Sequence, residues 1–266
     1  MEHNHTIQLI AIDMDGTLLD EHGDLPAAVL PVIKEVEARG VRVSLVSGRP
    51  TIFMQHIADA LGLNGAMVSF NGGAIVEQGK LIKASPFSMG PLKSVLQRAD
   101  EAGATVLIYT DWEAFALRES EWVIKNKHTI RRYTIRPFTD EEWKEMEVFK
   151  IAILYHHDEN LQQKIDTLLD PFDGHYCINR YGSRLCEIMD EGVDKGAGLE
   201  ALARLLEIPL EATLAIGDDV NDVTMLKRAG IGVAVNNAAD IAKAASDYVT
   251  EGSNTAGVIE AIRRFA

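Results

Sequence analysis

The sequence predicts an α/β fold in which helices cover a parallel β-sheet, with an α+β domain inserted into it. Near both ends of the chain, short runs of aliphatic and β-branched residues alternate with stretches whose apolar residues recur at helical spacing. This alternation is typical of parallel sheets with right-handed crossovers. Between about 83 and 188 the alternation is looser, and this stretch contains most of the aromatic residues and all three tryptophans. The change of pattern indicates the inserted domain.

The first half of the predicted core contains three strands and two helices. We expect a strand where a short apolar run occurs and a helix where apolar residues fall three and four positions apart. Gly40 ends the first helix as a C-cap would. The expected order is strand 7–12, helix 26–39, strand 41–46, helix 51–61 and strand 66–70.

The C-terminal part repeats the pattern, whereas the insert departs from it. The expected domains are a core formed by residues 1–82 and 189–266 and an insert formed by residues 83–188. The remaining core elements are helix 196–206, strand 213–216, a helix that ends at Ala229 and strand 231–235. The expected elements of the insert are strand 129–136, strand 149–155, helix 160–169 and a hairpin after His175.

Composition limits the classes of partner. The chain has 266 residues and a net charge of -14, which argues against nucleic acid as the main partner because phosphate backbones need a basic face. No run reaches the roughly 18 apolar residues that a membrane span requires. The first residues lack the positive region and cleavage site of a signal peptide. We therefore expect a cytoplasmic protein that binds neither nucleic acid nor membrane, and leave the oligomeric state open.

The two cysteines form no metal-binding pattern. Cys177 and Cys186 flank a predicted turn at 180–183, so their thiols are expected to face each other across two strands. In a reducing compartment they should stay free and contribute to core packing.

Two carboxylates, Asp13 and Asp15, follow directly on the first predicted strand, and Gly16 lets the chain turn away behind them. Acids that point the same way repel each other and are costly to desolvate, so this pattern indicates a metal site or a reaction. A simple turn is the alternative, because the chain has 40 acidic residues and D-x-D arises often by chance.

Three further features are found at strand ends or at a helix start, where ligands of parallel sheets bind. The segment 218–222 adds more carboxylates, and a cluster of them favours Mg²⁺. The hydroxyl of Ser47 and the N–H groups after it suit phosphoryl oxygens, and Lys195 begins a helix where anions are favoured. The alternatives are a solvated acidic helix cap, an ordinary Ser-Gly turn and a surface lysine.

Taken in order, these motifs resemble the haloacid dehalogenase-like (HAD) superfamily, and most of all its Cof-like phosphatases. The resemblance covers nearly the whole chain. It implies a Rossmann-like parallel-sheet core, and the insert is found where this subfamily carries its cap domain. The segments that carry the resemblance are 12–19, 47–50, 71–72, 187–188, 193–196 and 216–222, followed by 225–226, 229–230, 232–235 and 237–238.

The resemblance also implies catalytic roles. Asp13 would be the nucleophile that forms an aspartyl-phosphate. Asp15 would protonate the leaving alcohol and then activate water. The Asp13 carboxylate, the Asp15 backbone carbonyl and Asp218 would hold Mg²⁺, with Asp222 in support. The residues implied to hold the phosphoryl group are Ser47, Lys195 and Asn221, with the backbone N–H groups of Met14 and Gly48.

Together these implications predict a Mg²⁺-dependent phosphatase of small phosphomonoesters, most of all sugar phosphates, whose cap reads the leaving group. Lys150, Arg180 and Tyr181 are candidates for that reading, and a structural role is the alternative for each. Asp219 departs from the family pattern and adds a carboxylate near the expected metal. A phosphomutase and a non-catalytic sensor of a phosphorylated metabolite are the alternative functions.

Overall fold

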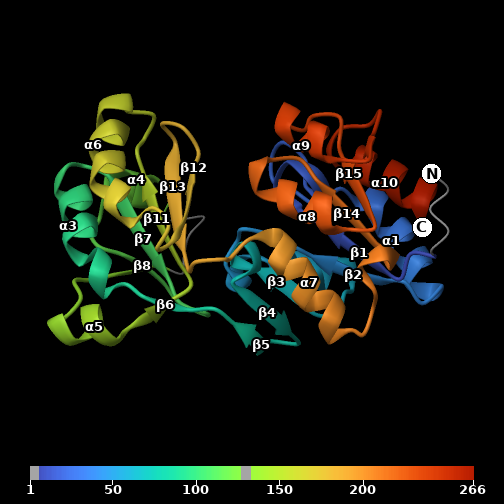
Figure 1. Ribbon diagram of the computed structural model, residues 1–266, viewed down its shortest axis with the longest axis horizontal. Helices are drawn as coiled ribbons and strands as arrows, with labels where there is room; N and C mark the ends of the chain where they lie inside the picture. Colours follow the sequence, from blue (N-terminus) through green and yellow to red (C-terminus); the bar gives the residue numbers. More distant parts are fainter. Residues whose placement is uncertain (1–5, 127–132) are drawn as a thin grey trace. The chain divides into compact units, whose positions relative to one another are not determined.

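The computed structural model describes residues 6–126 and 133–266. The chain forms two compact units (Figure 1). The core unit contains the chain up to Ala84 together with Asp194–Ala266, and the cap unit is Ser85–Val193. Each unit has its own cluster of buried apolar side chains.

The core unit is built on a five-stranded parallel sheet with the order β16-β15-β14-β1-β2. All four residues of β1 are buried, as expected for an interior strand of a parallel sheet covered on both faces. The chain proceeds in one direction from β1 to β2 and in the other from β14 to β16, so β1 and β14 flank the switch point where open sheets bind ligands. The strands are β1 Leu9–Ile12, β2 Arg42–Leu45, β14 Thr213–Gly217, β15 Ile231–Ala234 and β16 Tyr248–Val249.

A small antiparallel sheet, β3-β4-β5, adjoins β2 through a parallel bridge between Val46 and Val68. The strand expected at 66–70 therefore meets the main sheet at one bridge and pairs with β4 along its length. The helix expected at 51–61 begins as a 3₁₀ turn, Thr51–Phe53, before α2. These elements of the core unit are β3 Met67–Ser69, β4 Ala74–Glu77, β5 Lys80–Ala84, α1 Leu30–Ala38, α2 Gln55–Leu61, α7 Lys195–Leu205, α8 Val223–Arg228, α9 Asp240–Ala245 and α10 Asn254–Phe265.

The cap unit is built on a six-stranded mixed sheet with the order β12-β13-β11-β7-β8-β9. Alternate residues of its central strands, such as Ile108 and Ile151, share a buried cluster with Leu96 of α3 and Ile165 of α6. These two helices therefore cover one face of the sheet. The strands are β6 Phe87–Ser88, β7 Thr105–Tyr109, β8 Ala114–Ala116, β9 Tyr133–Ile135, β10 Glu147–Val148, β11 Lys150–Leu154, β12 Cys177–Arg180 and β13 Leu185–Met189. The helices are α3 Lys93–Glu101, α4 Glu121–Asn126, α5 Asp140–Glu145 and α6 Glu159–Leu169.

The predicted α/β class, with a parallel core sheet and an inserted mixed-sheet domain, is confirmed. The beginning of the strand expected at 129–136 lies outside the described residues, and its end is β9. The expectation that the two thiols face each other is wrong. Cys177 pairs with Met189 and Cys186 with Arg180, so the hairpin register separates the thiols along the strands. Both cysteines are free.

Candidate active site

Asp13 and Asp218 follow the two central strands of the core sheet. Ile12 of β1 is in register with Ile216 of β14, and the backbone N–H of Asp13 donates to the Ile216 carbonyl at 2.9 Å. The parallel pairing therefore brings the chain to the same edge of the sheet after both strands. This edge lies at the switch point, where side chains from several loops converge.

The turn after β1 depends on Gly16. Its φ of +81° lies in the left-handed region, and a Cβ there would come within 2.3 Å of the Asp218 Oδ2 atom. Glycine thus permits both the turn and the close approach of the carboxylate. The turn is fixed from the C-terminal side of the chain, where Asn237 donates to the Gly16 carbonyl at 2.7 Å. The side chain of Met14 is buried beneath it.

Lys195 joins the two halves of the site from the first position of α7. Its Nζ donates to Asp13 Oδ1 and to Asp222 Oδ1, each at 2.6 Å, and its side chain is 1% exposed. Burial lowers the pKa of Lys195, but the two carboxylates outweigh it and raise the pKa above its ordinary value. The ammonium group therefore stays charged in the interior. The alternative of a surface lysine is excluded.

The loop after β14 is held by Asp222. Its Oδ2 atom accepts from the N–H groups of Asp218 at 2.9 Å and Asp219 at 3.0 Å. Asp218 in turn accepts from the Thr17 hydroxyl at 2.7 Å, which ties this loop to the turn after β1. Both acidic loops are thus parts of one hydrogen-bonded arrangement.

The donor set fits a magnesium ion. Asp13, Asp218 and Asp222 each offer a carboxylate oxygen, and these atoms lie within 4.8 Å of one another. Burial raises the pKa of Asp13 well above its ordinary value, with Lys195 opposing this and the neighbouring carboxylates adding to it. Burial likewise raises the pKa of Asp218 to about 6. A divalent cation would relieve this repulsion, and hard carboxylate oxygens are the ligands that Mg²⁺ prefers.

The side chain of Asp15 pairs with Arg49 and does not join this group of carboxylates. Arg49 binds it in a bidentate pair, with Nε 2.8 Å from Oδ2 and Nη2 2.6 Å from Oδ1. The Asp15 carboxylate is half-exposed and is not part of the three-carboxylate group that the described residues form. Of Asp15, only the backbone carbonyl remains available to bind the expected metal. The sequence analysis assigned a role to the Ser47 hydroxyl and the N–H groups of this loop. It did not predict that the Arg49 side chain binds Asp15.

Asp219 is also outside that group. It caps the turn that follows, and its carboxylate accepts from the Val220 N–H at 2.7 Å. The helix-cap interpretation, considered for the whole acidic segment, thus applies to Asp219 and to the buried Asp222, which completes the capping box.

Three of the expected phosphate-binding residues, Ser47, Gly48 and Asn221, lie around Asn71, which the sequence analysis did not assign to the site. Ser47 is buried, and its carbonyl accepts from the Asn71 N–H at 2.9 Å. Asn221 donates from Nδ2 to Asn71 Oδ1 at 2.9 Å, and a Cβ at Gly48 would come within 2.9 Å of the same oxygen. Asn71 therefore connects the loops after β2, β3 and β14. In the sequence, the motif at 71–72 was the feature that could have indicated a role for Asn71.

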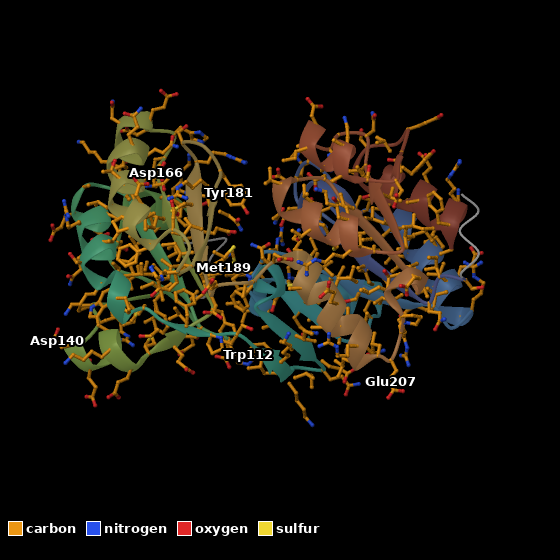
Figure 2. All side chains as sticks on the ribbon, viewed as in Figure 1. Trp112, Asp140, Asp166, Tyr181, Met189 and Glu207 are labelled. Atoms are coloured by element: carbon orange, nitrogen blue, oxygen red, sulfur yellow. The ribbon has the colours of Figure 1, made fainter. Side chains whose placement is uncertain are left out.

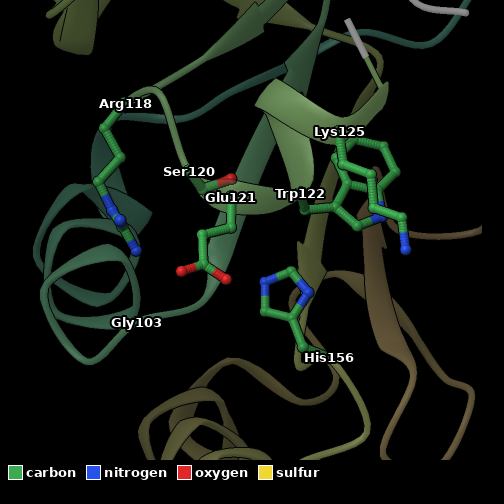
Figure 3. Close-up of a pocket in the computed structure, with 7 residues that line it drawn as sticks. All are labelled: Gly103, Arg118, Ser120, Glu121, Trp122, Lys125 and His156. Carbon is green, nitrogen blue, oxygen red and sulfur yellow. The ribbon is translucent and has the colours of Figure 1, made fainter.

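The cap unit contains a pocket of its own, of about 480 Å³ (Figure 3). Several of its polar groups are already paired within the cap. Arg118 donates to Asp100 at 2.8 Å, and Thr105 binds both the Ser120 hydroxyl and a ring nitrogen of His156. This pocket lacks the clustered carboxylates of the core unit.

The chain belongs to the haloacid dehalogenase-like hydrolases, whose family model matches residues 10–262. It is a phosphatase of this family, a phosphoric monoester hydrolase. The chain is 29% identical to a 5-amino-6-(5-phospho-D-ribitylamino)uracil phosphatase of Bacillus subtilis, over 97% of this chain and 96% of that protein. It is 30% identical to a phosphoglycolate phosphatase of Methanosarcina acetivorans, over 95% of this chain and 94% of that protein.

Solved structures share the whole fold. A haloacid dehalogenase-like hydrolase from Bacteroides thetaiotaomicron superposes with a TM-score of 0.85 at 27% identity, covering 98% of this chain and all (100%) of that one. A protein from Thermotoga maritima superposes with a TM-score of 0.84 at 22% identity, and the superposition covers 98% of each chain. Across the described residues, none of the helices has the length and apolar character needed to cross a bilayer.

Proposed function

We propose that this protein hydrolyses small phosphomonoesters, most of all sugar or polyol phosphates, with Mg²⁺ and through an aspartyl-phosphate on Asp13. One observation carries the proposal: the buried Lys195 ammonium bridges Asp13 and Asp222 beside Asp218, while Asp15 points away from that group. This arrangement supports separate tasks for the two acids of the first motif. We include the cytoplasmic location in the proposal.

Asp13, Asp218 and Asp222, with the backbone carbonyl of Asp15, would hold Mg²⁺, which supplies positive charge against the charges of the carboxylate nucleophile and the phosphate. Lys195 adds a second, permanent positive charge at the Asp13 carboxylate. A phosphate dianion can approach an anionic nucleophile only where such charge is concentrated, because the chain as a whole carries -14.

In the first step an Asp13 oxygen bonds to phosphorus, and the bond from phosphorus to the ester oxygen breaks. Asp15 gives its proton to the departing alkoxide, so the leaving group departs as a neutral alcohol. In the second step Asp15 takes a proton from water as that water attacks phosphorus. The bond to Asp13 breaks and inorganic phosphate is released.

The residues that hold the phosphoryl group in this scheme come from four loops. Ser47 and Lys195 would bind its oxygens through their side chains, with the backbone N–H groups of Met14 and Gly48. Asn221, which Asn71 orients, would complete the set. Donors fixed in advance by such contacts stabilise a developing charge without reorganisation.

Two of the most similar relatives support the substrate class. The names of these two proteins specify phosphate esters of a ribityl compound, which is a polyol, and of glycolate, which is a hydroxy acid. Both support small phosphomonoesters, and the first supports polyol phosphates. We assign selection among such esters to the cap unit, because loops and inserted segments vary more freely than the core that holds phosphate.

The test is phosphate release from a panel of phosphorylated metabolites, together with p-nitrophenyl phosphate, in Mg²⁺ and without a bisphosphate activator. We expect steady release from several sugar or polyol phosphates. A matched panel with the Asp13→Asn variant controls for contaminating phosphatases. Transfer to a second hydroxyl without release would indicate the phosphomutase, and binding without turnover would indicate the sensor.

A further inference from the structure

The pocket within the cap unit lies at one end of the cap sheet (Figure 3). β7 begins there at Thr105, opposite the last residue of the antiparallel strand β11, Leu154. Four short segments of the cap therefore meet at this end: the loop after α3, the loop after β8, the start of α4 and the turn after β11. Their side chains in the pocket include Arg118, Ser120, Glu121, Trp122, Lys125 and His156.

Two opposite charges face this pocket without pairing with each other. The guanidinium of Arg118 and the carboxylate of Glu121 both point into it (Figure 3). The ion-pair partner of Arg118 is Asp100, at 2.8 Å. Within residues 6–126 and 133–266, the carboxylate of Glu121 has neither an ion pair nor a hydrogen bond.

Neighbouring opposite charges elsewhere in the cap unit do meet. Lys93 binds Asp140 at 2.5 Å, and Arg180 binds Asp166 at 3.3 Å; both aspartates are labelled in Figure 2. These pairs show that long side chains of the cap close on each other where they can. The two charges of the pocket are instead held apart by a space that a ligand with both charges could bridge.

Arg118 retains donors for such a ligand. Its Nε donates to Asp100 at 2.8 Å, and its Nη2 donates to the Ala104 carbonyl at 3.2 Å. A guanidinium has five N–H groups, so three of them have no acceptor in the part of the chain that the structure describes. The side chain is 41% exposed at the pocket. A guanidinium is the side-chain group that best matches the planar geometry of a carboxylate.

Ser120 provides a second donor, and this one is buried. The residue is 4% exposed and lines the pocket. Its Oγ accepts from the Thr105 hydroxyl at 2.6 Å and from the Val123 N–H at 3.3 Å, which fills both acceptor positions of a hydroxyl. The hydrogen of this hydroxyl has no acceptor among the described residues. A buried donor left without an acceptor costs free energy, which a ligand oxygen would recover.

The charges around the pocket cancel. Arg118 and Lys125 are two cations, and Asp100 and Glu121 are two anions. The His156 ring adds no charge at neutral pH, because burial lowers its pKa and the nearby Arg118 adds to this effect. The pocket therefore gives a phosphate dianion no net attraction, in a chain that carries -14 overall. A ligand that is itself neutral, with separated charges, matches it better.

We propose that this pocket binds a free α-amino acid, with its carboxylate on Arg118 and Ser120 and its ammonium group on Glu121. The volume of about 480 Å³ lies in the usual range of small-molecule sites. The indole of Trp122 gives the ligand's side chain an apolar surface. The site belongs to the cap unit alone, so it is independent of the proposed phosphatase function.

The first experiment titrates the full chain with each standard L-amino acid, followed by ligand-observed NMR. We expect at least one to bind with a Kd below about 10 mM. The amide of that amino acid lacks the carboxylate, and its N-acetyl derivative lacks the ammonium group, so each should bind about tenfold or more weakly. Inorganic phosphate is the probe for a simple anion site and should not displace the amino acid.

The decisive variant is Glu121→Gln, which removes the charge and keeps the size of the side chain. We expect it to bind the amino acid about tenfold or more weakly than the wild type. The N-acetyl derivative has no ammonium group to lose, so its affinity should stay within about twofold. Glu159→Gln is the matched control, because Glu159 is likewise an exposed acid at the first position of a cap helix. It should leave both affinities unchanged.

The amino-acid site is ruled out if no amino acid binds below about 10 mM, or if the amide and the N-acetyl derivative bind as tightly as the parent. Unchanged binding of the amino acid by Glu121→Gln would contradict the contact with the ammonium group. An equal loss of the amino acid and its N-acetyl derivative in that variant would indicate a structural role for Glu121 and also overturn the assignment. Displacement by inorganic phosphate would show an anion site instead.

Discussion

The surroundings of the individual site residues affect their ionisation in different ways. Lys195 is held charged by two carboxylates, whereas Asp13 and Asp218 are buried among like charges that disfavour ionisation. Asp15 is half-exposed and bound to Arg49. In the proposed mechanism these different surroundings would give the two acids of the first motif different tasks, although both are aspartates.

The acid role of Asp15 predicts a dependence on the leaving group. Asp15→Asn should slow a sugar phosphate on the order of 100-fold or more, since its alkoxide must be protonated as it departs. With p-nitrophenyl phosphate the loss should be about tenfold smaller, because nitrophenolate needs little protonation. Steady-state kinetics with both esters measures the difference, and equal losses would contradict the acid role.

The crowded carboxylates predict that the metal-free site destabilises the fold at neutral pH. The pKa of Asp218 is about 6 in the folded chain and 3.8 ordinarily, so folding favours the protonated form. Its contribution is fully present below about pH 4 and is lost as the pH rises through 6.

Asp218→Asn should therefore raise the stability of the chelator-treated protein at pH 7, on the order of 1 kcal/mol, with a smaller effect at pH 4. The asparagine oxygen can still accept from Thr17. Urea unfolding in chelator at both pH values measures this, and the same variant should lose activity in Mg²⁺. A variant less stable than the wild type at pH 7 would contradict the account.

At the scale of elements, the apolar runs predicted the main strands because strands buried on both faces need continuous apolar sequence. The expected site loops followed from the same elements, since parallel strands end at one edge. The pairing of β3 with β4 was not predicted, because register depends on partners that the local sequence does not specify.

The contacts that complete the site are long-range. Arg49 and Asp15 are 34 residues apart, and Asn221 and Asn71 are 150 apart. Each pair depends on the packing of loops from different strands. Apart from the motif at 71–72, no local pattern contains that information. The sequence therefore indicated the loops but neither the Arg49 contact nor the position of Asn71 between them.

The turn after β1 allows a test with a matched control. Gly16 and Gly23 have φ values of +81° and +80°, but only at Gly16 would a Cβ meet another residue, Asp218. Alanine at either position should cost about 1 kcal/mol through backbone strain. Only Gly16→Ala should also lose activity and weaken activation by Mg²⁺. Thermal unfolding and a magnesium titration of the phosphatase rate separate the two effects, and equal activity in both variants would contradict this account of the turn.

The whole molecule is strongly acidic, so its long-range field opposes an anionic substrate. Attraction must come from the site itself, where the charge of Lys195 is shared between two carboxylates. In the proposed function the phosphate chemistry belongs to the core unit, and the cap unit packs around an apolar cluster of its own.

This reasoning predicts metal dependence with a particular selectivity. Chelation should abolish phosphate release, and Mg²⁺ should restore it. Ca²⁺ should restore it poorly, because it takes more ligands at longer distances and would distort the reacting geometry. Rates measured after dialysis against chelator and addition of each ion test this. Full activity in excess chelator would show that the three carboxylates have another purpose.

The most direct test of the covalent mechanism is the turnover of Asp13→Asn in Mg²⁺ with p-nitrophenyl phosphate. The substitution keeps the size of the side chain and removes the anionic nucleophile. The account predicts a loss of several orders of magnitude in a variant that unfolds as cooperatively as the wild type. Retention of more than about a tenth of the wild-type rate would contradict an aspartyl-phosphate on Asp13, because an activated nucleophile contributes far more than that.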